Sequence, residues 1–279
     1  MKIAIASGKG GTGKTTVAVN LALSLDNCQL LDCDVEEPDC NIFLHLLLEN
    51  LEDIYLPVPE IDKEKCTFCG KCSEFCQYNA LAIFPQTQNA LVFKDLCHGC
   101  GGCTLLCPEN AITEKKKLIG VLERGLDSRL EFVRGVLNIG EAMATPVITG
   151  LKKKIDTKKV AILDSPPGTA CPVIETISGC DFCILVTEPT PFGLHDLKLA
   201  VGLTRILQVP CGVIINKAGI GDNTVDAYCK RESIPVLMEI PHDMKIAQLC
   251  SRGTPFVEKM PSWKEKFQNL FTTVEEMIL

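Results

Sequence analysis

Short apolar runs, each bounded by charged, glycine or proline residues, recur along most of the chain. They lie at Lys2–Ala6, Gln29–Cys33, Val160–Leu163, Phe182–Thr187, Cys211–Ile215 and Ile234–Met238. Continuous runs of this length, rich in Ile, Val and Leu, are typical of strands that are buried on both faces of a parallel sheet. We therefore predict a sheet built from these segments.

Segments with helical periodicity separate most of the apolar runs. They lie at Thr15–Leu25, Gly193–Leu207, Asp222–Arg231, Asp243–Cys250 and Trp263–Met277. This alternation predicts an α/β fold with a doubly wound, mostly parallel sheet and helices on both faces. The last helix mixes both signs of charge on its polar face, so we expect it to dock on the core and not to form a stable membrane anchor.

The α/β rhythm stops between Pro59 and Lys115, and a cysteine-rich segment with an internal repeat takes its place. We predict a discontinuous main domain made of residues 1–57 and 119–279, with an inserted domain at residues 58–118. About sixty residues bury little core unaided, so such an insert needs covalent or metal crosslinks to fold.

The insert carries the pattern C-x2-C-x2-C-x3-C twice, offset by 31 residues. This is the run of bacterial two-cluster ferredoxins, in which the fourth cysteine ligates the other cluster. The predicted ligands of one 4Fe–4S cluster are Cys66, Cys69, Cys72 and Cys107. Those of the second are Cys76, Cys97, Cys100 and Cys103. Zinc is the alternative, but structural zinc sites use two well-separated C-x2-C pairs, so the compact spacing favours clusters.

Composition limits the cellular compartments and the classes of partner that we expect for this chain. The 279-residue chain has 17 cysteines, a net charge of −7 and no apolar run long enough to span a membrane. A glycine-rich loop follows directly after the first strand, which leaves no room for a signal peptide, so we expect a cytoplasmic protein. In the cytoplasm thiols are kept reduced, so we expect the cysteines to bind metal and not to form disulfides. The negative charge disfavours nucleic acid as a partner.

A glycine-rich loop follows the first strand and precedes the first helix. Its residues are Gly8, Lys9, Gly10, Gly11, Thr12, Gly13, Lys14, Thr15 and Thr16. In G-x4-G-K-S/T loops the backbone amides cradle phosphates, the lysine reaches the β and γ oxygens, and the hydroxyl next to it binds Mg²⁺. The loop predicts an ATP/ADP and Mg²⁺ site at Lys14 and Thr15.

Lys9, near the start of the loop, makes it resemble the deviant Walker A loop of the MinD/ParA superfamily of P-loop ATPases. This superfamily includes the nitrogenase iron protein and Mrp-type iron–sulfur carriers. The resemblance implies an ATP-sandwich homodimer in which Lys9 reaches the ATP of the partner. It also implies that Asp34 orients the attacking water and that Asp164 holds Mg²⁺. By the same resemblance, Asn216 and Lys217 contact adenine, and the segment 241–255 packs against the base.

Several residues have more than one interpretation. Asp32 either contacts water bound to Mg²⁺ or caps a turn. By resemblance to the nitrogenase iron protein, Cys171 is a possible additional ligand of a cluster that bridges a dimer; otherwise it is a small buried residue or a thiol that receives a transferred cluster. Cys180 and Cys183 are three residues apart, so strand geometry would direct them to opposite faces and favours core packing for both.

Three functions follow from joining a nucleotide switch to redox-active iron. The first is an ATPase that gates electron delivery to an acceptor protein. The second is an ATP-dependent carrier or scaffold that loads a cluster or metal onto targets, with a cluster-acceptor protein as its partner. The third is a ParA-like positioning switch that uses its clusters as a redox sensor.

Overall fold

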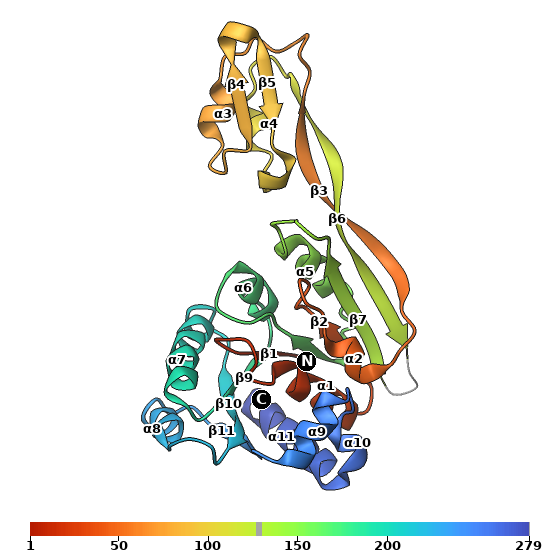
Figure 1. Cartoon of the computed structure of the whole chain (residues 1–279), viewed down its shortest axis with the longest axis vertical. Coiled ribbons are helices and arrows are strands. Elements are labelled where there is room, and N and C mark those ends of the chain that lie inside the picture. Colours follow the sequence, from red (N-terminus) through yellow and green to blue (C-terminus); the bar gives the residue numbers. More distant parts are fainter. Residues whose placement is uncertain (127–129, 279) are drawn as a thin grey trace.

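A single sheet organises the chain in a computed structural model that describes residues 1–126 and 130–278. Nine strands of this part follow the order β11-β10-β9-β1-β8-β2-β7-β6-β3 (Figure 1). All neighbours from β11 to β7 are parallel: β1 Lys2–Ala6, β2 Cys28–Asp32, β7 Leu130–Leu137, β8 Val160–Asp164, β9 Phe182–Thr187, β10 Cys211–Ala218 and β11 Val236–Pro241. The predicted α/β fold with a mostly parallel sheet is confirmed.

Helices cover both faces of the sheet (Figure 1). One face packs against α5 Thr145–Lys152, α6 Cys171–Ile177, α7 Pro191–Ile206 and α8 Thr224–Arg231. The other face packs against α1 Lys14–Ser24, α9 Met244–Ser251, α10 Phe256–Lys259 and α11 Pro261–Ile278, and the short α2 Cys40–Leu44 lies on this side as well. Buried side chains alternate between the faces: Ala4 and Ala6 of β1 join the first layer, whereas Ile3 and Ile5 join the second.

A long antiparallel ribbon extends the sheet beyond β7. It pairs β3 Glu49–Ile61 with β6 Ile112–Leu126, and the near half of β6 also pairs with β7. The ribbon rises from the sheet and carries the cysteine-rich segment at its far end (Figure 1). Pro57 and Pro59 lie in β3, the edge strand of the sheet. Proline has no backbone N–H to donate, and an edge strand tolerates this because it has a neighbour on one side only.

The ribbon runs through the positions at which we predicted domain boundaries. Residues 57 and 58 both lie in β3, and residues 118 and 119 both lie in β6. The Lys115–Lys117 run, expected to mark a border, is part of β6 and faces Pro57 and its neighbours across the ribbon.

Residues 62–111, which we call the head, repeat one small unit. They form α3 Lys71–Phe75, β4 Leu81–Phe84, a 3-10 turn at Pro85–Thr87, β5 Asn89–Val92, a second 3-10 turn at Lys94–Leu96, and α4 Gly102–Leu106. α3 and α4 begin 31 residues apart, each after a glycine with positive φ, Gly70 at 81° and Gly101 at 72°. The sequence repeat is therefore a structural repeat.

The last helix, α11, docks on the core as predicted. Its buried side chains Trp263, Phe267, Leu270 and Val274 pack in the layer that also holds α1. No helix within residues 1–126 and 130–278 combines the length and apolar character needed to cross a membrane.

Substitution of two leucines in β6 tests how strongly the buried part of the ribbon stabilises the fold. Leu122 is fully buried in the layer with α5, whereas Leu118 is 42% exposed. We expect Leu122→Ala to lower the free energy of unfolding by about 2–5 kcal/mol, because it leaves a cavity in a packed core. The matched change Leu118→Ala should cost no more than about 1 kcal/mol. Anaerobic urea unfolding followed by circular dichroism measures both, and equal losses would contradict this account of the anchor.

Candidate functional site

The glycine-rich loop joins β1 to α1 in a tightly held conformation. Gly13 has a φ of 92°, and a Cβ atom built on it would lie 2.4 Å from Nδ2 of Asn216. That Nδ2 donates a hydrogen bond of 2.8 Å to the carbonyl of Thr12. Asn216, at the carboxyl end of β10, therefore supports the loop directly.

A cavity of about 220 Å³ opens beside this loop. Gly13 and Thr16 line one wall, Asn216 and Lys217 a second, and the segment from Ile240 to Cys250 a third. The structure thus brings the predicted adenine-contacting residues next to the phosphate loop. The mixture of apolar and polar side chains that lines this cavity suits a heterocyclic base.

Two buried carboxylates stand side by side below the loop. Asp32 ends β2 and Asp164 ends β8, and the two are registered partners in the sheet. Oxygens of Asp32 accept hydrogen bonds from the backbone N–H groups of Asp34 (3.2 Å) and Cys40 (3.0 Å). The Cys40 thiol donates to Oδ2 of Asp164 at 3.4 Å, and Oδ1 of Asp164 is buried without a hydrogen-bond partner.

The negative charge of Asp32 and Asp164 favours binding of a cation beside them. Burial raises the pKa of Asp164 against the opposing effects of the Thr15 hydroxyl and the Lys14 ammonium. Burial and the charge of Asp164 raise the pKa of Asp32 as well. Ligand atoms of Asp32, Cys40 and Asp164 lie within 4.8 Å of one another. An unpaired carboxylate oxygen in such a place fits a divalent cation such as Mg²⁺, which prefers oxygen ligands.

Asp34 follows β2 and is only partly buried. Burial raises its pKa to about 7, and nearby carboxylates of Asp164 and Glu37 add to the rise while Lys14 opposes it. A carboxyl group with a pKa close to 7 can accept a hydrogen bond from water or exchange a proton at physiological pH. The position of Asp34 beside Lys14 is compatible with its predicted role.

Lys9 is held by a residue that the sequence analysis did not single out. Its ammonium lies 3.5 Å from Glu188, which also pairs with Lys217. These contacts outweigh burial and lower the pKa of Glu188. Glu188 directly follows β9, so its place at the carboxyl edge of a predicted parallel strand was the available signal. Cys40 was also missed, because it lies eight residues from Asp32 in a segment without clear periodicity.

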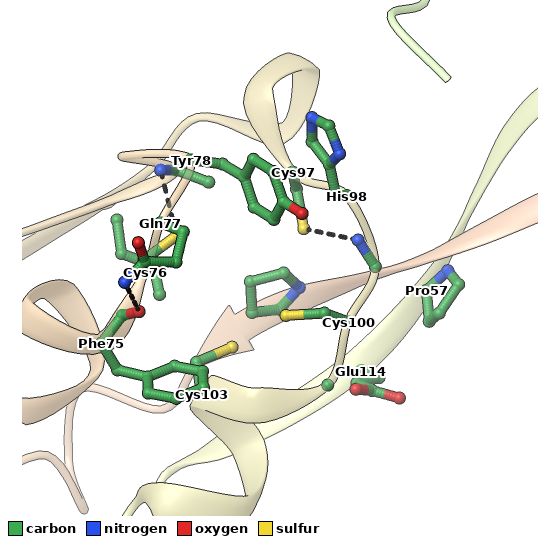
Figure 2. A pocket seen from close by; sticks show the side chains of 15 residues that line it. Pro57, Phe75, Cys76, Gln77, Tyr78, Cys97, His98, Cys100, Cys103 and Glu114 are labelled. Carbon is green, nitrogen blue, oxygen red and sulfur yellow. Dashed lines mark hydrogen bonds between the residues drawn. The ribbon is translucent and has the colours of Figure 1, made fainter. Parts of the chain in front are cut away.

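The head gathers the eight cysteines of the repeat into the two predicted sets of four. One cavity, of about 220 Å³, is lined by Cys76, Cys97, Cys100 and Cys103, whose sulfurs face a common space (Figure 2). A second, smaller cavity is lined by Cys66, Cys69, Cys72 and Cys107. Each set combines three cysteines from one copy of the repeat with one from the other.

Backbone amides point at sulfurs at repeat-related positions. Phe68 donates to the sulfur of Cys66, and Gly99 donates to that of Cys97, both at 3.4 Å. The sulfurs of the fourth cysteines accept equivalent bonds of 3.3 Å, Cys76 from Ala80 and Cys107 from Ala111. Amide bonds of this kind stabilise thiolates that bind metal. Tyr78 and His98 stack with ring centroids 3.6 Å apart at the rim of the larger cavity (Figure 2).

The spacing of these sulfurs bears on the kind of metal. In the described residues the head cysteines form no set of three ligand atoms within 4.8 Å of one another, as a single zinc ion would need. A cubane cluster presents its irons at separate corners and keeps its thiolates farther apart. The donor set of four cysteines around a cavity therefore fits a cluster better than one ion.

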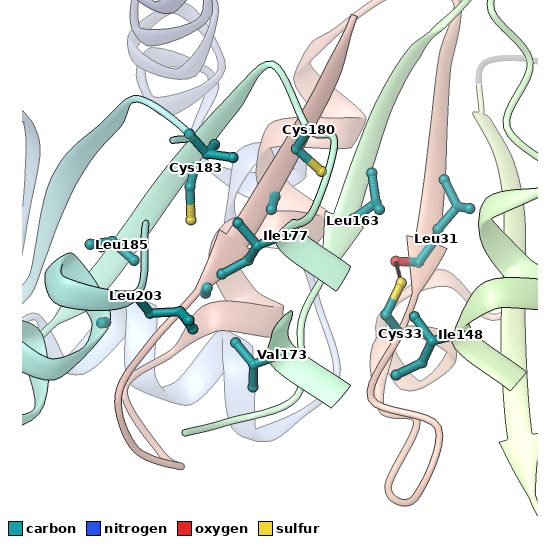
Figure 3. Close-up of a cluster of buried hydrophobic side chains, with 14 of the residues drawn as sticks. Leu31, Cys33, Ile148, Leu163, Val173, Ile177, Cys180, Cys183, Leu185 and Leu203 are labelled. Carbon is teal, nitrogen blue, oxygen red and sulfur yellow. Dashed lines mark hydrogen bonds between the residues drawn. The ribbon is translucent and has the colours of Figure 1, made fainter. Parts of the chain in front are cut away.

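Other cysteines are distributed differently from our expectation. Cys180 precedes β9, so strand alternation does not apply to it, and it is buried in the same layer as Cys183 and Cys33 (Figure 3). The prediction of opposite faces was wrong, although both residues pack in the core. Cys171 is exposed at the first position of α6, which excludes its interpretation as a small buried residue.

Comparison with known proteins agrees with this geometry. A family model described as the CobQ/CobB/MinD/ParA nucleotide binding domain matches residues 3–256. The chain belongs to this MinD/ParA family. It is therefore a nucleotide-binding protein with the fold of a P-loop ATPase.

Relatives of this MinD/ParA-family chain extend the comparison. An uncharacterized protein of Methanocaldococcus jannaschii is 32% identical, with 99% of this chain and 96% of the relative covered. A protein of the same organism named iron-sulfur cluster carrier protein is 25% identical, with 99% and 84% covered. The structure of the septum site-determining protein MinD with Mg-ADP from Pyrococcus horikoshii has a TM-score of 0.57 at 20% identity, covering 99% and 95%.

The pKa of Asp34 predicts a pH dependence for ATP hydrolysis by this MinD/ParA-family chain. The carboxylate is the form that accepts a hydrogen bond, so protonation as the pH falls through about 7 should reduce kcat/KM, which reports groups of the free enzyme. Asp34→Asn should lower the rate about 100-fold and abolish this acid limb. Glu37→Gln, an exposed neighbour, should keep the limb and move it slightly to lower pH. An unchanged limb in Asp34→Asn would contradict the assignment.

Two glycines of the loop form a matched pair for nucleotide binding. Alanine at Gly13 meets both a positive φ and the side chain of Asn216, whereas a Cβ atom at Gly10 meets open space. We expect Gly13→Ala to weaken ADP binding at least about tenfold, because the strained loop loses its support. Gly10→Ala should change the affinity less than about threefold. Isothermal titration with Mg-ADP measures both, and equal affinities would be inconsistent with this role of Gly13.

Proposed function

We propose that the chain is a Mg²⁺-dependent ATPase whose head holds two 4Fe–4S clusters and delivers electrons to a partner protein under nucleotide control. The observation that carries this proposal is the gathering of eight cysteines into two complete sets of four. The head that contains them stands on a ribbon whose base is part of the nucleotide-binding sheet. We also propose that residues 58–118 form an inserted ferredoxin domain.

In this proposal each cluster is shared between the two copies of the repeat. Cys66, Cys69, Cys72 and Cys107 would hold one cluster. Cys76, Cys97, Cys100 and Cys103 would hold the other. The clusters supply one-electron chemistry when bound, and the backbone amides of residues 68, 80, 99 and 111 stabilise the thiolates. Cys69 and Cys100 are exposed, so one sulfur of each set reaches the surface that a partner can approach.

The nucleotide side uses the residues around the two buried carboxylates. Thr15 and Asp164 would hold Mg²⁺, Lys14 the β and γ phosphates, and Asp34 the attacking water. Lys9 would act across an ATP-sandwich homodimer, since its side chain is 34% exposed and, among the residues that the structure describes, its ammonium pairs with Glu188 at 3.5 Å. Lys9 is partly exposed, and Glu188 keeps its pair with Lys217 when Lys9 leaves, so the ATP of a partner can compete for the Lys9 ammonium.

A second candidate is an ATP-dependent carrier of iron–sulfur clusters. It is favoured by the relatives named iron-sulfur cluster carrier proteins and by the exposed thiol of Cys171 at the start of α6. The complete four-cysteine sets favour electron transfer, because a carrier needs a site that releases its cargo.

Iron counting distinguishes the two candidates. We expect protein purified anaerobically to hold about eight irons per chain, to show reducible signals by electron paramagnetic resonance, and to keep its iron through ATP hydrolysis. Cys107→Ser should remove about half of the iron, whereas Cys250→Ser, outside the head, should remove none.

Addition of an acceptor protein to the same experiment distinguishes electron delivery from cluster transfer. Transfer of iron to an apo-ferredoxin that depends on Mg-ATP would support the carrier and contradict electron delivery. Protein that holds no iron after anaerobic reconstitution would contradict both.

A further inference from the structure

Lys117 joins the head to the nucleotide-binding domain. It lies in β6, and its ammonium contacts Asp95 of the head at 2.7 Å and Glu141 of the loop after β7 at 3.0 Å. The Lys117 and Glu141 side chains are 18% and 12% exposed, whereas that of Asp95 is 81% exposed. One ammonium thus bridges two parts of the chain through a protected contact and an open one.

The loop that carries Glu141 is tied to the segment after β2. Leu137, the last residue of β7, donates its N–H to the carbonyl of Val35 at 2.8 Å, and Val35 directly follows Asp34. The next residue, Asn138, donates its N–H to Ile119 and its side-chain amide to Leu118, both in β6. A displacement at Asp34 and Val35 therefore reaches β6 through one hydrogen bond to Leu137 and two parallel hydrogen bonds from the next residue, Asn138.

On the other side, Asp95 lies next to the second cysteine set. It is the middle residue of the 3-10 turn Lys94–Leu96, and the N–H of Cys97 bonds to the carbonyl of Lys94 in that turn. Close packing continues beyond it, because a Cβ atom on Gly99 would lie 2.7 Å from the Leu56 side chain of β3. The contact at Asp95 therefore belongs to the part of the head that carries Cys97 and Cys100.

We propose that Lys117 is the positioning residue that sets the orientation of the head and transmits the nucleotide state from the segment at Asp34 and Val35 to it. A two-stranded ribbon on its own is only marginally stable, so its pairing does not fix the direction of the head. A contact away from the ribbon axis is needed, and Lys117 provides it to both sides. The inference rests on the proposed function only in requiring that nucleotide reorders the segment at Asp34.

The two contacts of Lys117 have different roles because they differ in exposure. The pair with Glu141 is shielded from water and stays formed while the loop holds its place. The pair with Asp95 faces solvent and is screened by salt, so it can open without unfolding either side. Movement of the loop would carry the ammonium away from Asp95 and free the head.

Hydrogen exchange read by mass spectrometry tests this on the full iron-loaded chain, with Mg-ADP and with Mg-AMPPNP. In Lys117→Met we expect the peptides covering 135–141 and 93–99 to exchange about tenfold faster, and the difference between the two nucleotides to vanish in 93–99. Lys117→Arg, which keeps the charge, should restore at least half of that difference. Asp95→Asn should speed exchange only in 93–99, and 0.5 M salt should have the same effect on the wild type.

The controls separate positioning from general damage. Lys115→Met removes the same charge from the same strand, but Lys115 pairs with Glu60 inside the ribbon, so both peptides should behave as in the wild type. Lys117→Met combined with Glu141→Gln should add nothing to Lys117→Met alone, since the two residues act as one unit.

A result in which Lys117→Met matches Lys115→Met would overturn the proposal. Iron is counted in every sample: absence of iron with an intact Lys117 effect would contradict the proposed electron transfer and leave the positioning role standing.

Discussion

The registered pair of buried carboxylates, Asp32 and Asp164, is the constraint around which the nucleotide site is built. Parallel strands end at the same edge of a sheet, so the pairing of β2 with β8 forces these two side chains together. Two like charges away from water are unfavourable unless donors and a cation compensate them. The N–H groups of Asp34 and Cys40, the Cys40 thiol and the Lys14 ammonium provide part of this compensation. The remaining unpaired oxygen of Asp164 is the atom of this pair that fits a divalent cation.

The ribbon makes the head an extension of the same sheet. β6 pairs with β7 near its base and with β3 from Ile112 to Arg124, so two continuous strands join the head to the sheet. The head itself has few buried side chains and two cavities lined by cysteines, so the proposed clusters would add crosslinks that its small core lacks. Sharing each cysteine set between both repeat copies would then lock the two copies together.

Ion pairs that differ in exposure lie beside the phosphate loop and between the head and the loop after β7. Glu188 holds Lys9 and Lys217 near the phosphate loop, and Lys117 holds Glu141 and Asp95 between the loop after β7 and the head. Exposed pairs contribute little to stability, so their value lies in being broken at small cost. A protein that changes its contacts with each nucleotide state benefits from such pairs more than from apolar ones, whose separation exposes a packed surface.

The sequence by itself determined the parts whose signals are local. The phosphate loop, the strands Lys2–Ala6 and Phe182–Thr187, and the two sets of head cysteines each follow from a short spacing or a continuous apolar run. The long ribbon did not, because its strands are separated by the whole head, contain Pro57 and Pro59, and are half exposed without clean alternation.

Contacts between residues far apart in the chain were decided only by the tertiary structure. Cys40 meets Asp164 across 124 positions, and the ammonium of Lys117 meets both Asp95 of the head and Glu141 of the loop after β7. Periodicity describes which face a residue occupies within its own element, whereas these contacts depend on which strands become neighbours and how the loops between them fold.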